Sequence, residues 1–277
     1  MTSVPVGSPP QPPSRGEGGE ATASGVLLSV AYDGRRFSGF ALQREQRTVA
    51  GELWGALRAI DPSIAEVRGA SRTDTGVHAR DQRVAFDPSR DYPLSAWLQG
   101  TAKHLPEEIA IRAAWVVPRG FAPRFHSKAK TYRYVLLADE ARDPFLVGRA
   151  WRVAELASPE ALGRMQAEAK LAVGTHDFAA FRNAADQRQN TVRTIFELSV
   201  GPSPEHPRVL HVDVRGGGFL YNMVRILVGT LVDVARGRLE PGAIERALLS
   251  KDRRDAGITA PPDGLYLERY EIEGVDV

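Results

Sequence analysis

The segment 69–82 gathers the side chains of this sequence that are best suited to chemistry. Its sequence, GASRTDTGVHARDQ, places Arg72, Asp74, His78 and Arg80 within nine positions and shows no apolar period. Threonines and a glycine flank the acid, and short polar residues favour turns because their side chains bond their own backbone. A carboxylate that must stay ionised as a nucleophile also gains from a nearby guanidinium. Asp74 is therefore either a turn residue or the carboxylate of an active site.

A second unusual residue is Arg225, which stands in the apolar stretch 219–235. Burying a guanidinium costs free energy unless an acceptor pairs with it. Three interpretations stay open: Arg225 reaches the surface along an edge of its helix, pairs with Asp233, or serves an active-site carboxylate. Tyr132, in the stretch KTYRY, is likewise either a core aromatic residue or an active-site group.

The stretch 109–138 is basic and rich in aromatic residues. It holds six cations and no acid, whereas the whole chain has a net charge of only +2. Cations beside aromatic rings suit the phosphates and unstacked bases of RNA. The same pattern is typical of a solvated strand face beside core aromatics, so this stretch alone does not decide. The six cations are Arg112, Arg119, Arg124, Lys128, Lys130 and Arg133.

Composition excludes several kinds of chemistry. The chain has no cysteine, so disulfides, thiolate nucleophiles and cysteine-ligated metals are excluded. Its six histidines lack metal-ligand spacing, and neither a glycine-rich phosphate loop nor a serine nucleophile elbow is present. Chemistry on a carboxylate, without a metal or cofactor, is what remains. With no signal sequence and no apolar run of the roughly 18 residues that span a membrane, we expect a cytoplasmic protein.

The elements that must position these residues are strands and helices in mixed order. The regular alternation of a doubly wound sheet is missing and several strands suit antiparallel pairing, so an α+β fold is predicted. Thr48 and Ser158 are expected to cap helices. Strands are expected at 26–34, 64–70, 82–87, 109–117, 130–138, 191–200, 208–216 and 264–272, and helices at 48–60, 94–105, 158–174, 219–235 and 241–249.

Three regions are expected along the chain. Fourteen of the first 25 residues are Pro, Gly or Ser, which predicts a disordered extension over 1–25. An N-terminal half, 26–119, carries the Asp74 loop. A C-terminal half, 120–277, completes the active-site cleft.

Six blocks of the sequence resemble, in the same order, those of the tRNA pseudouridine synthase A family. RTDTGVHA at 72–79 resembles the catalytic motif, whose aspartate is essential in that family. The family commonly has Trp-Gln where this chain has Phe40 and Ala41, and often Gly at Ser71. The other blocks are YDGRRFSGF (32–40), KTYRY (130–134), DFAAFR with NTVRTI (177–195), FLYNMVRILVGTL (219–231) and AGITAPPDGLYL (256–267).

The resemblance implies an isomerase that converts uridine to pseudouridine at positions 38, 39 and 40 of the anticodon stem-loop of tRNA. Asp74 would be the nucleophile, and it starts glycosidic cleavage either by attacking the ribose or by abstracting a ribose proton, between which the sequence does not choose. Tyr132 would contact the target base and act in proton transfer, and Arg225 would pair with Asp74. The fold implied is that of a pseudouridine synthase, with two ferredoxin-like halves around a central, mixed sheet rich in antiparallel strands. A homodimer that needs no metal or cofactor is also implied.

Further contacts with the tRNA are expected from polar and basic residues near these motifs. Two other classes stay open. An RNA-binding or RNA-folding protein with little catalysis would keep its function in Asp74→Asn. A cofactor-independent hydrolase would need a second carboxylate, and no paired acid stands out near the motif. The expected contacts are Arg72, Thr73, His78, Arg124, Lys128, Lys130, Arg182 and Arg193, in addition to Tyr132.

Overall fold

The computed structural model describes residues 24–274, which divide into two units. Unit 1 holds the described residues up to Lys128 and those from Arg269 onward, and unit 2 holds Ala129–Glu268. Strand β10 (Leu265–Ile272) begins in unit 2 and ends in unit 1. The expected extension 1–25 lies almost entirely outside the described residues.

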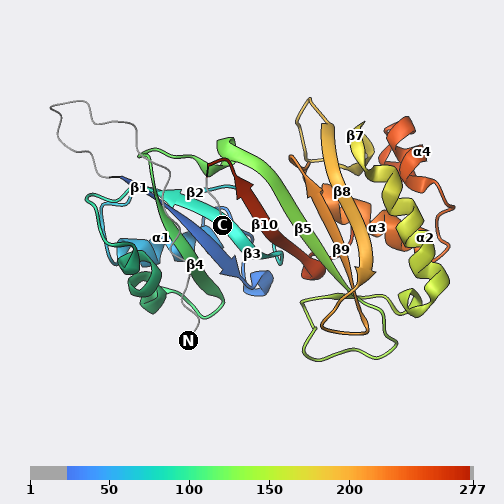
Figure 1. Cartoon of the computed structure of the whole chain (residues 1–277), viewed down its shortest axis with the longest axis horizontal. Coiled ribbons are helices and arrows are strands. Elements are labelled where there is room, and N and C mark those ends of the chain that lie inside the picture. The colour runs from blue at the N-terminus through green and yellow to red at the C-terminus, as the bar shows by residue number, and fades with distance from the viewer. Residues whose placement is uncertain (1–23, 275–277) are drawn as a thin grey trace. The chain divides into compact units, whose positions relative to one another are not determined.

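Unit 1 is built on an antiparallel ladder in which β1 (Gly25–Tyr32) lies between β3 (His78–Phe86) and β4 (Ile109–Val117) (Figure 1). Helix α1 (Val49–Arg58) buries the apolar face that the sequence predicts. Thr48 caps it as expected, because its side chain accepts the Gly51 N–H. These elements leave the segment before β3, which contains Asp74, as a loop.

One expectation for unit 1 was wrong, and a second is confirmed with a different type of helix. The strand expected at 64–70 is reduced to the two residues of β2 (Arg68–Gly69), which pair with β3. The helix expected at 94–105 is a short π-helix, Ala96–Gly100, followed by a 3-10 helix, Thr101–His104. The Trp97 ring is fully buried and packs edge-on against two other aromatic rings. Packing of one large side chain, rather than helix propensity, therefore shapes this segment.

Asp61 ties the segment after α1 to a distant loop of unit 1. One carboxylate oxygen accepts the N–H (3.0 Å) and the hydroxyl (2.6 Å) of Ser63, and the other accepts the N–H (2.7 Å) and the hydroxyl (2.8 Å) of Ser89. Burial alone would raise the pKa of this carboxyl. The four hydrogen bonds outweigh burial and lower the pKa of Asp61 from 3.8 to about 2.

We expect Asp61→Asn to lower the free energy of unfolding by about 2 kcal/mol at neutral pH. Because the folded-state pKa lies below the unfolded one, this contribution is present above roughly pH 4 and is lost as the pH falls toward about 2. Urea unfolding of both proteins at neutral pH and near pH 3 measures the difference, which should shrink at the acidic value. If the two proteins differed equally in free energy of unfolding at both pH values, the loss would come from the shape of the asparagine side chain and not from the charge of Asp61.

Unit 2 contains an antiparallel ladder in the order β5 (Ser127–Leu137), β9 (Val209–Gly216), β8 (Val192–Pro202) and β7 (Gly174–Asp177). The strands expected at 191–200 and 208–216 are confirmed as β8 and β9, and they pair antiparallel. A short strand, β6 (Trp151–Arg152), runs parallel to β5.

Three helices gather on one side of this unit, where α2 packs against both α3 and β8 (Figure 1). Helix α2 begins after Ser158, whose hydroxyl accepts the Ala161 N–H as an N-cap. Every residue of α3 except Arg225 is buried. Its bounds are Met223–Ala235, and those of α2 and α4 are Pro159–Ala169 and Ala243–Ser250.

The α+β class predicted from the mixed order of elements is confirmed, since both units combine antiparallel strands with helices. Among residues 24–274, no helix has the length and apolar character that crossing a membrane would require.

Candidate functional site

The Asp74 loop is closed by main-chain hydrogen bonds. The Asp74 carbonyl accepts the Val77 N–H (3.1 Å), and Gly76 adopts a φ of +81° inside this turn. The Thr73 carbonyl accepts the Phe40 N–H (3.1 Å). These bonds use backbone atoms, so any side chain at this position leaves them available, and the residue Asp74 is half-buried. Turn chemistry and an active-site role are thus compatible at this residue.

The block 32–40 forms the support beneath this loop. A Cβ atom at Gly34 would lie 2.0 Å from the Val77 carbonyl oxygen, so only glycine allows this approach. The Tyr32 and Thr73 hydroxyls share a hydrogen bond of 2.7 Å. Phe40, which replaces the family's common Trp, is buried against the backbone of Gly69. This substitution therefore falls on a core residue.

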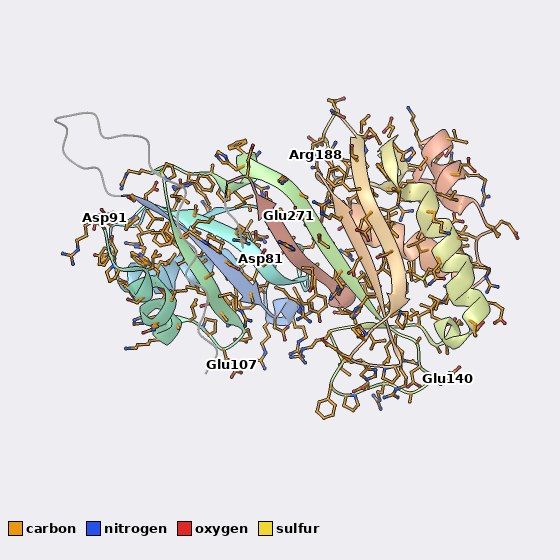
Figure 2. All side chains as sticks on the ribbon, viewed as in Figure 1. Asp81, Asp91, Glu107, Glu140, Arg188 and Glu271 are labelled. Atoms are coloured by element: carbon orange, nitrogen blue, oxygen red, sulfur yellow. The ribbon has the colours of Figure 1, made fainter. Side chains whose placement is uncertain are left out.

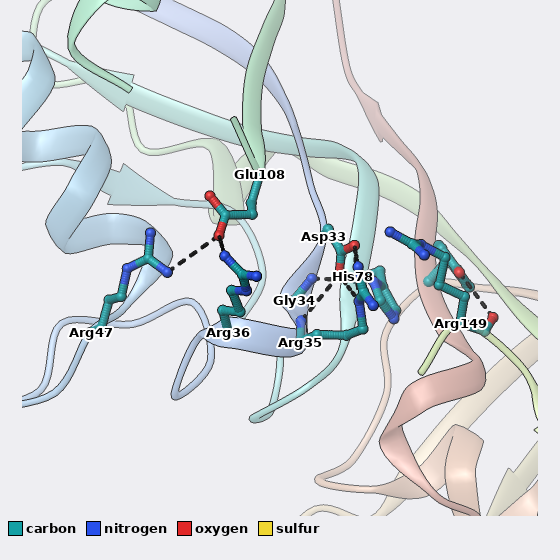
Figure 3. A network of polar contacts seen from close by, with 9 residues as sticks. Asp33, Gly34, Arg35, Arg36, Arg47, His78, Glu108 and Arg149 are labelled. Carbon is teal, nitrogen blue, oxygen red and sulfur yellow. Dashed lines mark hydrogen bonds and ion pairs between the residues drawn. The ribbon is translucent and has the colours of Figure 1, made fainter. Parts of the chain in front are cut away.

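His78 holds the turn at Asp33 and Gly34 (Figure 3). It is only 2% exposed; its Nδ1 accepts the Gly34 N–H (3.1 Å) and lies 3.3 Å from an Asp33 oxygen. Burial would raise the pKa of Asp33, but hydrogen bonds from the side chain and the N–H of Arg35 lower it to about 2. His78 thus braces the support of the Asp74 loop, and its direct contact with RNA stays a prediction.

The same network extends along unit 1 through Glu108. Its carboxylate lies 3.3 Å from Arg36 and 3.5 Å from Arg47, as the dashed lines in Figure 3 show. Two cations are thereby held near the turn that supports the Asp74 loop.

In unit 2, Arg225 is held at the start of α3 by neutral acceptors. Its Nε donates to the Ala260 carbonyl (2.8 Å), and its Nη1 donates to the Asn222 side-chain oxygen (3.2 Å). The segment around Ile258 lies flat on α3, because a Cβ atom at Gly229 would lie 1.8 Å from the Ile258 carbonyl oxygen. These contacts fix both the helix end and the guanidinium that it carries.

Asp233, the alternative partner for Arg225, has other contacts. It stands two turns farther along α3, where its Oδ2 accepts the Ile258 N–H (3.0 Å) and its Oδ1 lies 3.8 Å from Arg238. Arg225 is also half-buried rather than fully exposed at a helix edge. Because Arg225 and Asp74 belong to different units, their pairing stays a proposal.

Tyr132 lies on β5 and is 8% exposed, with its ring edge-on to Phe219 at 5.2 Å between centroids. Tyr134 shares that face of the strand, because residues two apart point the same way. Its hydroxyl donates to the Pro261 carbonyl (2.7 Å). Burial raises the pKa of Tyr134 well above its usual value, and the charge of Arg225 opposes that rise. Unit 2 therefore brings Tyr132 and Arg225 to the same side of β5.

Sequence reasoning missed an ion pair that fixes the turn bearing Phe219. Arg188, labelled in Figure 2, donates to the buried Asp186 carboxylate through Nε (2.8 Å) and to the Phe219 carbonyl through Nη1 (3.1 Å). Asp186 also accepts the Tyr221 N–H (2.8 Å). These hydrogen bonds hold the pKa of Asp186 well below its usual range. The signal for this ion pair in the sequence was an acid and a base two residues apart, Asp186 and Arg188, in the polar stretch between DFAAFR and NTVRTI.

The other predicted RNA contacts differ in exposure. Arg182 donates to the Arg188 carbonyl, and Arg193 donates to carbonyls of Asn190 and Val192, so both are half-buried and partly tied to the backbone. Arg72, Arg124 and Lys128 are exposed, whereas Lys130 is half-buried.

The basic stretch 109–138 therefore combines features of both interpretations, an RNA-binding surface and a solvated strand face beside core aromatic residues. Its tyrosines and Trp115 are core residues, while Phe125 is exposed with the guanidinium of Arg124 over its ring at 4.7 Å. Within the described part of the chain, no three His, Asp or Glu side chains gather as metal ligands would.

Comparisons with known proteins agree with the motifs. A family model described as tRNA pseudouridine synthase matches residues 169–271. A tRNA pseudouridine synthase A from Geobacter sp. (strain M21) is 40% identical over 243 residues, covering 87% of this chain and 96% of that protein. One from Pseudomonas aeruginosa is 37% identical over 266 residues, covering 95% and 90%. Among solved structures, a Cbf5-Nop10-Gar1 complex is a distant match, with 10% identity, coverage of 88% of this chain and 58% of that one, and a TM-score of 0.35.

Proposed function

The chain belongs to the tRNA pseudouridine synthase A family, and from this premise we propose how it carries out the isomerisation of uridine in tRNA. The reaction breaks the bond between ribose C1′ and uracil N1, turns the base, and joins C1′ to C5, which gives up its proton. N1, which is no longer bound to the ribose, gains a proton in its place, so uridine and its product have the same composition. The hydrolase alternative does not fit this family.

We propose Asp74 as the nucleophile that starts glycosidic cleavage by attacking the ribose. The observation that carries this proposal is the construction of its loop. Main-chain bonds, two glycines and the Tyr32–Thr73 hydrogen bond all hold the backbone around Asp74, a residue that keeps part of its surface exposed. A fixed, accessible carboxylate is what nucleophilic attack on a bound sugar requires.

Arg225 is proposed to pair with Asp74 and keep that carboxylate ionised. Support comes from the fixed position of its guanidinium, whose Nε and one Nη are held by Ala260 and Asn222. A guanidinium offers five donor hydrogens in a planar fork, a geometry that can bind carbonyl oxygens and a carboxylate at the same time. A positive charge close to a carboxylate lowers its pKa and stabilises the ionised form.

Tyr132 is proposed to contact the target base and to relay the proton that leaves C5. Its ring already packs edge-on against Phe219, a geometry in which aromatic groups attract one another. Tyr132 shares its strand face with Tyr134, on which the charge of Arg225 acts, and its phenol group can both donate and accept a proton.

We place the target in the anticodon stem-loop, at positions 38, 39 and 40. Such a base must be flipped out of the stem, at a cost of a few kcal/mol that stacking and hydrogen bonds offset. The protein is proposed to act as a homodimer in the cytoplasm and to hold the phosphates through cations, so binding should weaken steeply with salt. These cations are Arg72, Arg124, Lys128, Lys130, Arg182 and Arg193.

Mapping pseudouridine on tRNA transcripts tests the proposed positions. Transcripts with uridine at 38, 39 or 40 should each gain pseudouridine there, and a transcript with cytidine at all three should gain none. Carbodiimide labelling followed by primer extension locates the product. Pseudouridine at other positions alone would overturn the anticodon assignment, and its absence from every tRNA would overturn the proposed function.

A further inference from the structure

A turn rich in glycine, residues 216–222, joins β9 to α3 and carries the ring that packs on Tyr132. Gly216 shares a face of the sheet with Tyr132, because Gly216 pairs with Lys130, two residues before Tyr132 on β5. A Cβ atom at Gly216 would lie 3.1 Å from the tip of the Phe219 ring, so this ring covers the glycine on that same face. The position of the Tyr132 ring therefore depends on where the turn holds Phe219.

The turn has few means of holding itself. Gly217 and Gly218 bring no side chains to anchor it, and glycine has the widest range of backbone conformations. Asn222, at the other end, has a φ of 60°, in the left-handed region that residues other than glycine rarely adopt. At the start, the Gly217 N–H donates to the Thr194 carbonyl (3.2 Å). The stretch between these two ends needs contacts from another segment.

The polar loop before β8 supplies those contacts, and Arg188 makes the one at Phe219. Its Nη1 donates to the Phe219 carbonyl (3.1 Å), and its Nε donates to the Asp186 carboxylate (2.8 Å). That carboxylate accepts the Tyr221 N–H (2.8 Å), and the Asn183 N–H donates to the Tyr221 carbonyl (3.0 Å). One ion pair thus holds the turn on both sides of Leu220.

We propose that Arg188 is a positioning residue for the isomerisation, which holds Phe219 and, through it, the ring of Tyr132 against the target base. The planar fork of a guanidinium suits this role, because it binds a carboxylate and a carbonyl oxygen at once. A displacement of about 1 Å that begins far from the reacting atoms can lower a rate by about 10². The inference rests on the proposed function of Tyr132 and names a residue on which that function depends.

Arg188→Gln is expected to lower the single-turnover rate constant at saturating tRNA by about 10-fold, with the Kd for tRNA within about two-fold of wild type. Arg188→Lys should lose nearly as much rate, since an ammonium keeps the charge but lacks the planar fork. Both variants should fold, because the N–H groups of Tyr221 and of residue 188 itself still donate to the Asp186 carboxylate. Filter binding gives the Kd, and thermal melting gives the folded fraction that corrects the rates.

A double-mutant cycle with Phe219→Ala separates positioning from general stability. Phe219→Ala should lower the same rate constant by about 10-fold. Adding Arg188→Gln to it should cost less than about two-fold more, because the ring that Arg188 holds is then absent.

Arg208→Gln is the matched control for breaking an arginine ion pair in unit 2. The Arg208 side chain is 50% exposed, against 48% for Arg188, and it pairs with Asp139 and Asp143. The rate constant should stay within about two-fold of wild type. An equal loss in Arg208→Gln and Arg188→Gln would overturn the inference, because the effect would then belong to any broken ion pair.

An unchanged rate in Arg188→Gln or in Phe219→Ala would also overturn the inference, and so would losses that multiply in the double variant. A weaker Kd in Arg188→Gln that Arg188→Lys restores, at a normal rate, would make Arg188 a phosphate contact instead. If wild type forms pseudouridine and any of these results appears, the inference fails alone. If wild type forms none, the proposed function fails and the inference fails with it.

Discussion

Asp74→Asn is expected to lower the rate constant of pseudouridine formation under single-turnover conditions by a factor on the order of 10⁴ or more. Asparagine has nearly the same shape but no charge, so it cannot attack the ribose. The turn should survive, because Thr73, Asp74 and Val77 hold it through main-chain atoms. The variant should therefore bind tRNA and melt within about 2 °C of wild type while failing to turn over.

Asp91→Asn is the matched control for removing one negative charge from unit 1. Asp91 is exposed, and its carboxylate accepts the Ser24 N–H at 2.9 Å (Figure 2). We expect a rate within about two-fold of wild type, since surface substitutions of this kind change little. A comparable loss of rate in both variants would show that charge balance, and not the position of Asp74, controls the reaction.

Arg225→Leu is expected to lower the single-turnover rate by about 10² to 10³, the usual cost of losing a preorganised donor in an active site. Leucine suits the apolar surroundings of α3 but offers no charge to Asp74. The variant also loses the hydrogen bonds to Ala260 and Asn222, so some loss of stability is expected. The rate at saturating tRNA, corrected for the folded fraction, separates the two effects.

Arg253→Leu is the control for that structural contribution. Arg253 donates to the Ala256 carbonyl (3.2 Å) and the Gly257 carbonyl (2.8 Å), so it anchors the same segment that Arg225 contacts. It should lower the melting temperature while keeping the rate within a few-fold of wild type. If Arg253→Leu lost as much rate as Arg225→Leu, the role of Arg225 would be to hold the segment and not to pair with Asp74.

Much of the fold could be predicted from apolar patterns, because the strands and helices with a clear period are those that bury one face. The start of α3 could not. Phe219–Leu220 look like part of an apolar helix, yet the helix begins at Met223 after Asn222, which has a φ of 60°. The Tyr221 N–H bonds Asp186, which lies 35 residues earlier. A helix start set by such a distant acid leaves no local signal.

The candidate site could be predicted in part. Asp74 and Arg225 can be identified from the sequence, because a polar motif and a charged residue within an apolar helix are local features. The burial of His78 and Thr73 could not be predicted, because it depends on contacts with Gly34 and Tyr32 of another segment.

The central claim, that Asp74 starts the conversion of uridine to pseudouridine in tRNA, is tested most directly by tritium release. A tRNA transcript labelled with tritium at C5 of uridine loses the label to water only when C5 forms the new bond to the ribose. Wild type is predicted to release the label, and Asp74→Asn none above background. No release by wild type, or equal release by the variant, would contradict the account.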